Sequence, residues 1–115
     1  MRYDHNNVFA KILRGDLPCK KILEDNFSLA FFDLCPKAKI HAIAIPKGHY
    51  TDAFDFHKKA TKEEIYNFYT FINKTVETLL LQSFRILSNI NSHSGQVVFH
   101  YHMHILGGEK LISQP

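Results

Sequence analysis

The sequence predicts an α+β domain with a mainly antiparallel sheet, and two observations carry this prediction. Several short segments have the alternating or continuous apolar character of buried strands. The segment from 61 to 80 instead repeats apolar residues every three or four positions, which indicates one long amphipathic helix. Strands in succession with a single long helix between them are typical of a sheet that a helix covers.

The first half of the chain is predicted to form a short helix and three strands. Asn6 or Asn7 can cap a helix over 8–13, and Gly15 can end it. Asp25 and Asn26 are typical turn residues, so the strands on either side of them should pair antiparallel. The three predicted strands cover 20–24, 27–34 and 41–45.

The second half should contain the long helix and two more strands. Residues 50–60 mix polar and aromatic side chains and are expected to be irregular. Thr61 and Glu64 form a capping box that begins the helix. A fourth strand is predicted over 84–88, a loop over 89–95, and a fifth strand over 97–106.

Composition favours one globular domain, residues 1–115, since 45% of residues are hydrophobic and 22% are charged. No apolar run approaches the roughly 20 residues of a membrane span, and the N-terminus lacks an apolar secretory signal. We therefore expect a cytoplasmic protein that binds no membrane, with Cys19 and Cys35 as free thiols. The net charge of +3 is not clustered, which disfavours nucleic acid but suits a small phosphate-bearing ligand.

The most informative feature is a set of three histidines at alternate positions in the last predicted strand. Side chains alternate between the two faces of a strand, so His100, His102 and His104 should share one face. Chance would place eight histidines in this spacing about 0.04 times per chain. The core-facing set would be Phe99, Tyr101, Met103 and Ile105.

Three interpretations of this histidine strand remain open from the residues alone. It could be an exposed polar face without a special role. It could hold a metal ion, although one straight strand spreads the outer rings too far apart, so that a mixed site would need His41. It could also carry a nucleophile, because a neutral imidazole attacks phosphorus esters at neutral pH without a separate base.

The segment from His100 to Gly108 resembles the signature of the histidine-triad (HIT) superfamily. Ser94-Gly95-Gln96 precedes it as in that family, and the resemblance runs from about Val8 to Gly108. It is strongest to the bacterial histidine-triad nucleotide-binding proteins. The other segments that carry it are 9–18, 30–38 and 41–47.

This resemblance implies a five-stranded sheet, continuous across a homodimer, and a set of catalytic histidines. His102 matches the nucleophile that attacks the α-phosphorus, while His100 and His104 match the outer positions that contact phosphate oxygens and fix the ring geometry. His41 matches a fourth histidine beside the triad; from the residues alone it could equally be a core histidine.

The same resemblance implies a nucleotide site. Asp33, with Leu34 beside it, matches the carboxylate that accepts hydrogen bonds from the ribose hydroxyls. Phosphate-side contacts match four residues: Asn89, Gly95, Gln96 and Val97. The base pocket would be lined by residues that could otherwise be ordinary core: Val8, Phe9, Ile12, Phe31 and Ile43.

Expected activity is hydrolysis at the α-phosphate, with a purine nucleoside 5′-phosphoramidate as substrate, AMP as product and no metal cofactor. The alternatives are a dinucleoside polyphosphate hydrolase, a nucleotide-binding sensor with little turnover, and a zinc-dependent hydrolase. Three residues depart from the family pattern: Val97 replaces a hydroxyl, Ser94 a glycine and Phe32 a polar residue. The tail from Glu109 to Pro115 is short, which puts the choice of leaving group in question.

Overall fold

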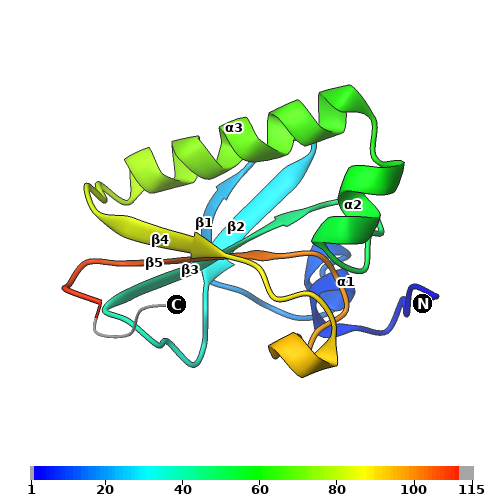
Figure 1. The fold of residues 1–115 in the computed structure, drawn as a ribbon, viewed down its shortest axis with the longest axis horizontal. Helices are drawn as coiled ribbons and strands as arrows, with labels where there is room; N and C mark the ends of the chain where they lie inside the picture. The colour runs from blue at the N-terminus through cyan, green and yellow to red at the C-terminus, as the bar shows by residue number, and fades with distance from the viewer. Residues whose placement is uncertain (1, 112–115) are drawn as a thin grey trace.

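The five strands form one antiparallel sheet in the order β1-β2-β3-β5-β4 (Figure 1). The computed structural model describes residues 2–111, so only the first three residues of the tail fall within it. The predicted α+β class and the antiparallel pairing of the first two strands are confirmed. The strands are β1 (Lys21–Glu24), β2 (Ser28–Phe32), β3 (Ile40–Pro46), β4 (Phe84–Leu87) and β5 (Met103–Gly107).

Among the described residues, three α-helices flank the sheet, α1 (Val8–Leu13), α2 (Ala53–Lys59) and α3 (Lys62–Thr78), and a short 3-10 helix covers Ser92–Ser94. Asn7 caps α1 by accepting a hydrogen bond from the Ala10 N–H, as its position predicted. The capping box of Thr61 and Glu64 begins α3, so this prediction is also confirmed. The expectation of an irregular segment over 50–60 is wrong, because Asp52 caps a short helix there through the Asp55 N–H.

The two faces of the sheet bury different side chains because residues alternate along β2 and β3. Alanines face α3, where their small side chains leave room for Phe68 and Phe71 of the helix. Larger side chains face the opposite side, where they pack against Phe9 of α1. The alanines are Ala30, Ala42 and Ala44, and the larger side chains are Leu29, Phe31, Ile43 and Ile45.

The predicted strand over 97–106 is correct only in its second half, since β5 begins at Met103. The ladder between β3 and β5 starts at the pair Ala44 and Met103 and runs away from Pro46, which has no N–H to continue it. Residues 97–102 therefore lie outside the β3–β5 ladder, with bends at Val98 and His100. The Tyr101 N–H donates to the Tyr50 carbonyl, which holds this segment in place.

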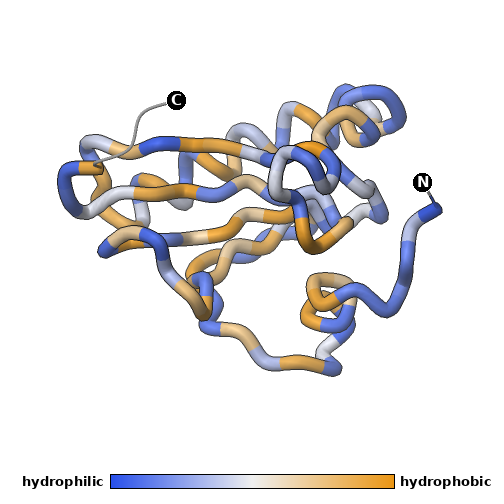
Figure 2. The backbone as a smooth tube through the Cα atoms, turned by 60° about the horizontal axis from the view of Figure 1, so that its bottom comes forward, coloured by the Kyte–Doolittle hydropathy of each residue, from blue (hydrophilic) through white to orange (hydrophobic). Residues whose placement is uncertain are grey.

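The N-terminal segment before α1 is mostly hydrophilic, whereas longer hydrophobic stretches lie in the strands (Figure 2). Cys19 is partly buried and Cys35 is exposed, and both are free thiols, as the sequence predicted. Among the described residues, none of the helices combines the length and the apolar character needed to cross a membrane.

Candidate active site

A cavity of about 570 Å³ opens on the sheet face opposite α3. Its floor is apolar, and two imidazoles and one carboxylate, from His102, His104 and Asp33, lie at its polar end. The register of the strands explains this grouping, because His104 of β5 pairs with Ile43 of β3 and so shares its face. The polar groups therefore border an apolar pocket of a size that suits a small organic ligand.

His102 is 7% exposed, and its ring is fixed by one hydrogen bond to the main chain. Its Nδ1 lies 2.7 Å from the His100 carbonyl oxygen, which can only accept, so Nδ1 carries the proton. In the neutral ring Nε2 then has a free lone pair. Burial lowers the pKa of His102, which keeps that lone pair available at neutral pH.

Two further contacts hold the His102 ring and its backbone. The ring of Phe9, from α1, stands edge-on at 5.0 Å between ring centroids. The Ser88 hydroxyl donates a hydrogen bond of 2.7 Å to the His102 carbonyl. Phe9 thus contacts the imidazole from the α1 side, and Ser88, directly after β4, holds the backbone of the same residue.

A chain of hydrogen bonds sets the protonation of His41 and His104. The Lys37 N–H donates to Nδ1 of His41 at 3.0 Å, so the proton of neutral His41 lies on Nε2. That Nε2–H donates to Nδ1 of His104 at 2.9 Å. The remaining proton of neutral His104 is then on Nε2, where it is free to donate to a ligand.

Burial keeps the rings of His41 and His104 neutral. Desolvation lowers the pKa of His104 to about 4, with smaller contributions from the neighbouring His102 and His41. Burial also lowers the pKa of His41, although the nearby carboxylate of Asp33 acts in the opposite direction. At neutral pH the site therefore offers one imidazole lone pair, on His102, and one imidazole N–H, on His104.

Asp33 follows β2 and is held by its own local contacts. Its Oδ1 accepts a hydrogen bond of 2.8 Å from the Cys35 N–H, a turn geometry typical of aspartate. Its Oδ2 lies 3.4 Å from Nε2 of His41. The side chain is 20% exposed, so the carboxylate borders the cavity while keeping lone pairs for a ligand.

Comparison with known proteins identifies this arrangement. A family model described as the HIT domain matches residues 14–111. The chain belongs to the HIT family. It is 44% identical over 112 residues to an uncharacterised HIT-like protein of Rickettsia prowazekii, which covers 96% of this chain and 93% of the relative.

Two other relatives carry more informative names. An adenosine 5′-monophosphoramidase of Schizosaccharomyces pombe is 34% identical over 99 residues, covering 86% of this chain and 71% of the relative. The solved structure of a HIT family hydrolase from Clostridium thermocellum matches with a TM-score of 0.84. That structure is 30% identical in sequence and covers 96% of this chain and 97% of its own.

Most residues predicted for the site of this HIT domain do lie around the cavity. They are the two histidines above and residues from α1, β2, β3 and the loop before β5. The full set of predicted residues that line it is Val8, Phe9, Ile12, Phe31, Asp33, Leu34, Ile43, Gly95, Val97, His102 and His104. Val97 is 83% exposed and Leu34 85% exposed, so both stand at the rim.

Four predicted residues lie outside the cavity lining. His41 contacts it through His104, as described, and Asn89 packs beside Gly95. Gln96 is buried, and its amide group donates to the Thr51 and Val98 carbonyls. The N–H groups of Gly95 and Gln96 donate to carbonyls of 91–92, which leaves these two donors committed within the loop.

His100 departs from the prediction that all three histidines share one face. It is completely buried and does not line the cavity, because residues 97–102 are not part of the β5 ladder. Its Nε2–H donates to the Pro46 carbonyl at 2.7 Å. Burial lowers the pKa of His100 to about 4, so the ring is neutral at neutral pH.

Sequence reasoning missed several residues that line the cavity of this HIT domain: Pro18, Cys19, Phe32, Cys35, Lys37 and Val98. Cys35 and Lys37 follow Asp33 closely in sequence, so their position after a predicted binding residue was the available signal. Pro18 and Cys19 lie in the connection between α1 and β1, and only the path of this connection brings them to the cavity. No pattern in the sequence predicts that these two residues lie at the cavity.

A metal ion is the remaining alternative for this HIT domain, because Asp33, His41 and His104 offer donor atoms within 4.8 Å of one another. A cation there would take the lone pair of His41 Nε2. That nitrogen carries a proton, since Nδ1 already accepts from the Lys37 N–H. Coordination would move the His41 proton to Nδ1, where two donors, this N–H and the Lys37 N–H, would point at each other. The three side chains therefore fit a hydrogen-bond chain better than a metal site.

Proposed function

We propose that this protein hydrolyses nucleotides at the α-phosphate through a covalent nucleotidyl-histidine, with a purine nucleoside 5′-phosphoramidate as substrate. The observation that carries the proposal is the fixed tautomer of His102. Its Nδ1–H is tied to the His100 carbonyl, which leaves the Nε2 lone pair at the edge of an apolar cavity. A neutral, oriented imidazole is a competent nucleophile toward phosphorus.

In the first step His102 Nε2 attacks the α-phosphorus and the P–N bond breaks. The amine departs with the bonding electron pair and takes up the proton of His104 Nε2. His104 supports this step because its Nε2–H can donate to a phosphate oxygen or to the departing nitrogen. His41 keeps that proton on Nε2 by donating to the other nitrogen of His104.

In the second step water attacks the nucleotidyl-histidine and releases AMP, and the proton that the water gives up replaces on His104 Nε2 the one that the amine took. The P–Nε2 bond breaks, and the imidazole regains its lone pair. Splitting one displacement into two is the general advantage of covalent catalysis. Each step uses a nitrogen of this chain, so the proposed mechanism requires no bound metal.

The walls of the cavity and one relative support the proposed substrate class. Asp33 retains carboxylate lone pairs that can accept the two ribose hydroxyl protons. Apolar side chains, Phe9, Phe31 and Ile43 among them, suit a stacked purine. The Schizosaccharomyces pombe relative, named an adenosine 5′-monophosphoramidase, supports adenosine phosphoramidates as the first substrates to test.

The test measures AMP release from adenosine 5′-phosphoramidate by wild type and His102→Ala, each with and without EDTA. We expect turnover by wild type that EDTA does not change, and none by the variant. Faster cleavage of diadenosine polyphosphate would favour the polyphosphate hydrolase instead. AMP binding without turnover by either protein would favour a nucleotide sensor, and loss of activity with EDTA would favour a metal enzyme.

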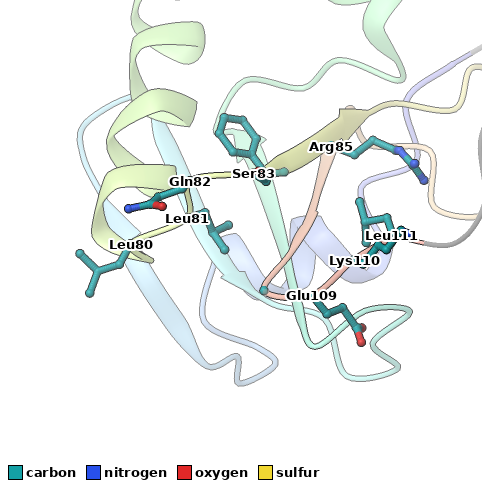
Figure 3. Close-up of a pocket in the computed structure, with 10 residues that line it drawn as sticks. Leu80, Leu81, Gln82, Ser83, Arg85, Glu109, Lys110 and Leu111 are labelled. Atoms are coloured by element: carbon teal, nitrogen blue, oxygen red, sulfur yellow. The ribbon is translucent and has the colours of Figure 1, made fainter.

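The HIT resemblance also implies a homodimer, and the end of the sheet supports that part of the proposal. β4 is the last strand in the sheet order, and its Phe84 and Ile86 are exposed. A groove of about 690 Å³ lies beside it, with Leu80 and Leu81 after α3 and residues 108–111 after β5 around it (Figure 3). An apolar edge strand of this kind is a template for pairing with another strand.

A further inference from the structure

The hydroxyl of Tyr3 reaches a buried ring of the histidine triad from the far end of the chain. It lies 2.5 Å from Nδ1 of His100, across 97 positions of sequence. The other ring nitrogen of His100, Nε2, donates to the Pro46 carbonyl. Because a neutral imidazole has one N–H, Nδ1 is the acceptor and the Tyr3 hydroxyl is the donor.

The segment before α1 is held in this position by several contacts. The Tyr3 ring stacks on His49 with 4.7 Å between centroids and 12° between planes. His5 packs edge-on against both rings. The Arg14 guanidinium donates to the His5 carbonyl at 2.6 Å. These contacts make the approach of the Tyr3 hydroxyl to His100 a fixed feature of the fold.

His100 connects this hydroxyl to the proposed nucleophile. Its ring is fully buried and satisfied at both nitrogens, and its carbonyl oxygen accepts the Nδ1–H of His102. Because the ring is held at both nitrogens, it anchors the backbone of the same residue and restricts the position of its carbonyl. The direction of the His102 lone pair therefore depends on how His100 is held.

We propose that Tyr3 is a positioning residue that, by donating to His100 Nδ1, holds the carbonyl that fixes the tautomer and direction of His102. Its effect on turnover rests on the proposed function. Its effect on the His102 ring does not. Tyr3 lies before residues 14–111, the part that the family model matches.

The alternative role is structural, in which Tyr3 packs the segment against the domain through its ring. Tyr3→Phe separates the two roles because it keeps the ring and its stack on His49 but removes the donor. Tyr3 belongs to neither hydrophobic core cluster, so the variant is expected to fold. Tyr66→Phe is the matched control, since it removes a hydroxyl from a tyrosine that is 71% exposed on α3.

Two measurements test the proposal, namely ¹H–¹⁵N NMR of the histidine rings in the free protein and steady-state kinetics with adenosine 5′-phosphoramidate. In Tyr3→Phe we expect the His100 Nδ1 resonance to shift and the single His102 tautomer to become a mixture. We expect kcat to fall about tenfold with KM nearly unchanged, because a small misplacement of a reacting group costs rate rather than affinity. Tyr66→Phe should match wild type in both.

Unchanged His102 resonances and an unchanged kcat in Tyr3→Phe would overturn the proposal. A rise in KM with unchanged kcat would also overturn it, since that pattern indicates a disturbed pocket rather than a misdirected nucleophile. If wild type releases no AMP, the proposed function fails, and the NMR comparison alone then decides whether Tyr3 positions His102.

Discussion

The Nε2 atom of His41 lies 2.9 Å from Nδ1 of His104, on the neighbouring antiparallel strand. This contact assigns a role to the fourth histidine, which the sequence alone left between core packing and catalysis. His41 is 5% exposed and is itself held by the Lys37 N–H. The Lys37 N–H therefore orients the His41 ring, and His41 in turn orients the ring of His104, which borders the cavity.

Replacing His41 should lower the rate of the proposed reaction without unfolding the protein. His41→Ala leaves the buried Nδ1 of His104 without its donor, a loss of roughly 1–3 kcal/mol, and lets the His104 proton leave Nε2. We expect kcat for adenosine 5′-phosphoramidate to fall roughly tenfold or more. The exposed His93→Ala is the control, and equal rates for the two variants would contradict this role.

Asp33 is expected to act on substrate binding through the ribose. Asp33→Asn keeps an oxygen for the Cys35 N–H but replaces one carboxylate acceptor, so KM should rise roughly tenfold. A 2′,3′-dideoxyadenosine phosphoramidate gives the internal check. Wild type should bind it as weakly as Asp33→Asn binds the parent substrate, and the variant should bind the two substrates alike. A variant that still distinguishes them would show that another group reads the ribose.

Stability should depend on pH through His100. Its pKa is lowered from 6.5 to about 4 by burial, so between these values the unfolded chain binds more protons than the folded one. The contribution of His100 to the free energy of unfolding should therefore be fully present above about pH 7 and be lost as the pH drops from 6.5 toward 4. This contribution is at most roughly 3–4 kcal/mol.

Urea unfolding at a series of pH values measures this dependence. His100→Gln removes the titrating group, so its stability should vary less with pH over the same range than that of wild type. His57→Gln changes a histidine on α2 whose ring contacts Tyr69 and serves as the control. An identical pH dependence for His100→Gln and wild type would refute the assignment.

The oligomeric state should depend on the β4 edge. Light scattering should give wild type twice the mass of one chain, and Ile86→Lys should shift it toward one, because a charge on an edge strand opposes strand pairing. Phe54→Lys places the same charge on an exposed apolar position of α2 and should leave the mass unchanged. A monomeric wild type would contradict the proposed dimer.

The elements that local chemistry determines were predictable from the sequence. The Asn7 cap and the capping box of Thr61 and Glu64 are short local motifs, and α1 and α3 begin directly after Asn7 and Thr61. Helix α2 was missed because seven residues give too short a period to separate from a loop, although Asp52 was a usable cap signal. The predicted strand over 97–106 was too long because the alternation of residues extends N-terminal to Met103, where the ladder with β3 ends.

The candidate site was predictable where one segment carries the pattern and not where distant segments meet. The spacing of His102 and His104 placed both rings at the cavity. The contacts from Tyr3 to His100 and from Lys37 to His41 depend on loop paths that no spacing encodes. The burial of Gln96 likewise follows from its bond to the Thr51 carbonyl, 45 positions away.

The central claim, a covalent intermediate on His102, is tested most directly by trapping it. Wild type would be mixed with excess adenosine 5′-phosphoramidate, quenched within one turnover and analysed by intact-mass and peptide mass spectrometry. We predict an adenylyl group on the peptide that contains His102, absent in His102→Ala and hydrolysed when the folded enzyme is left in water. AMP production by wild type with no adduct at any quench time, or undiminished turnover by His102→Ala, would contradict the account.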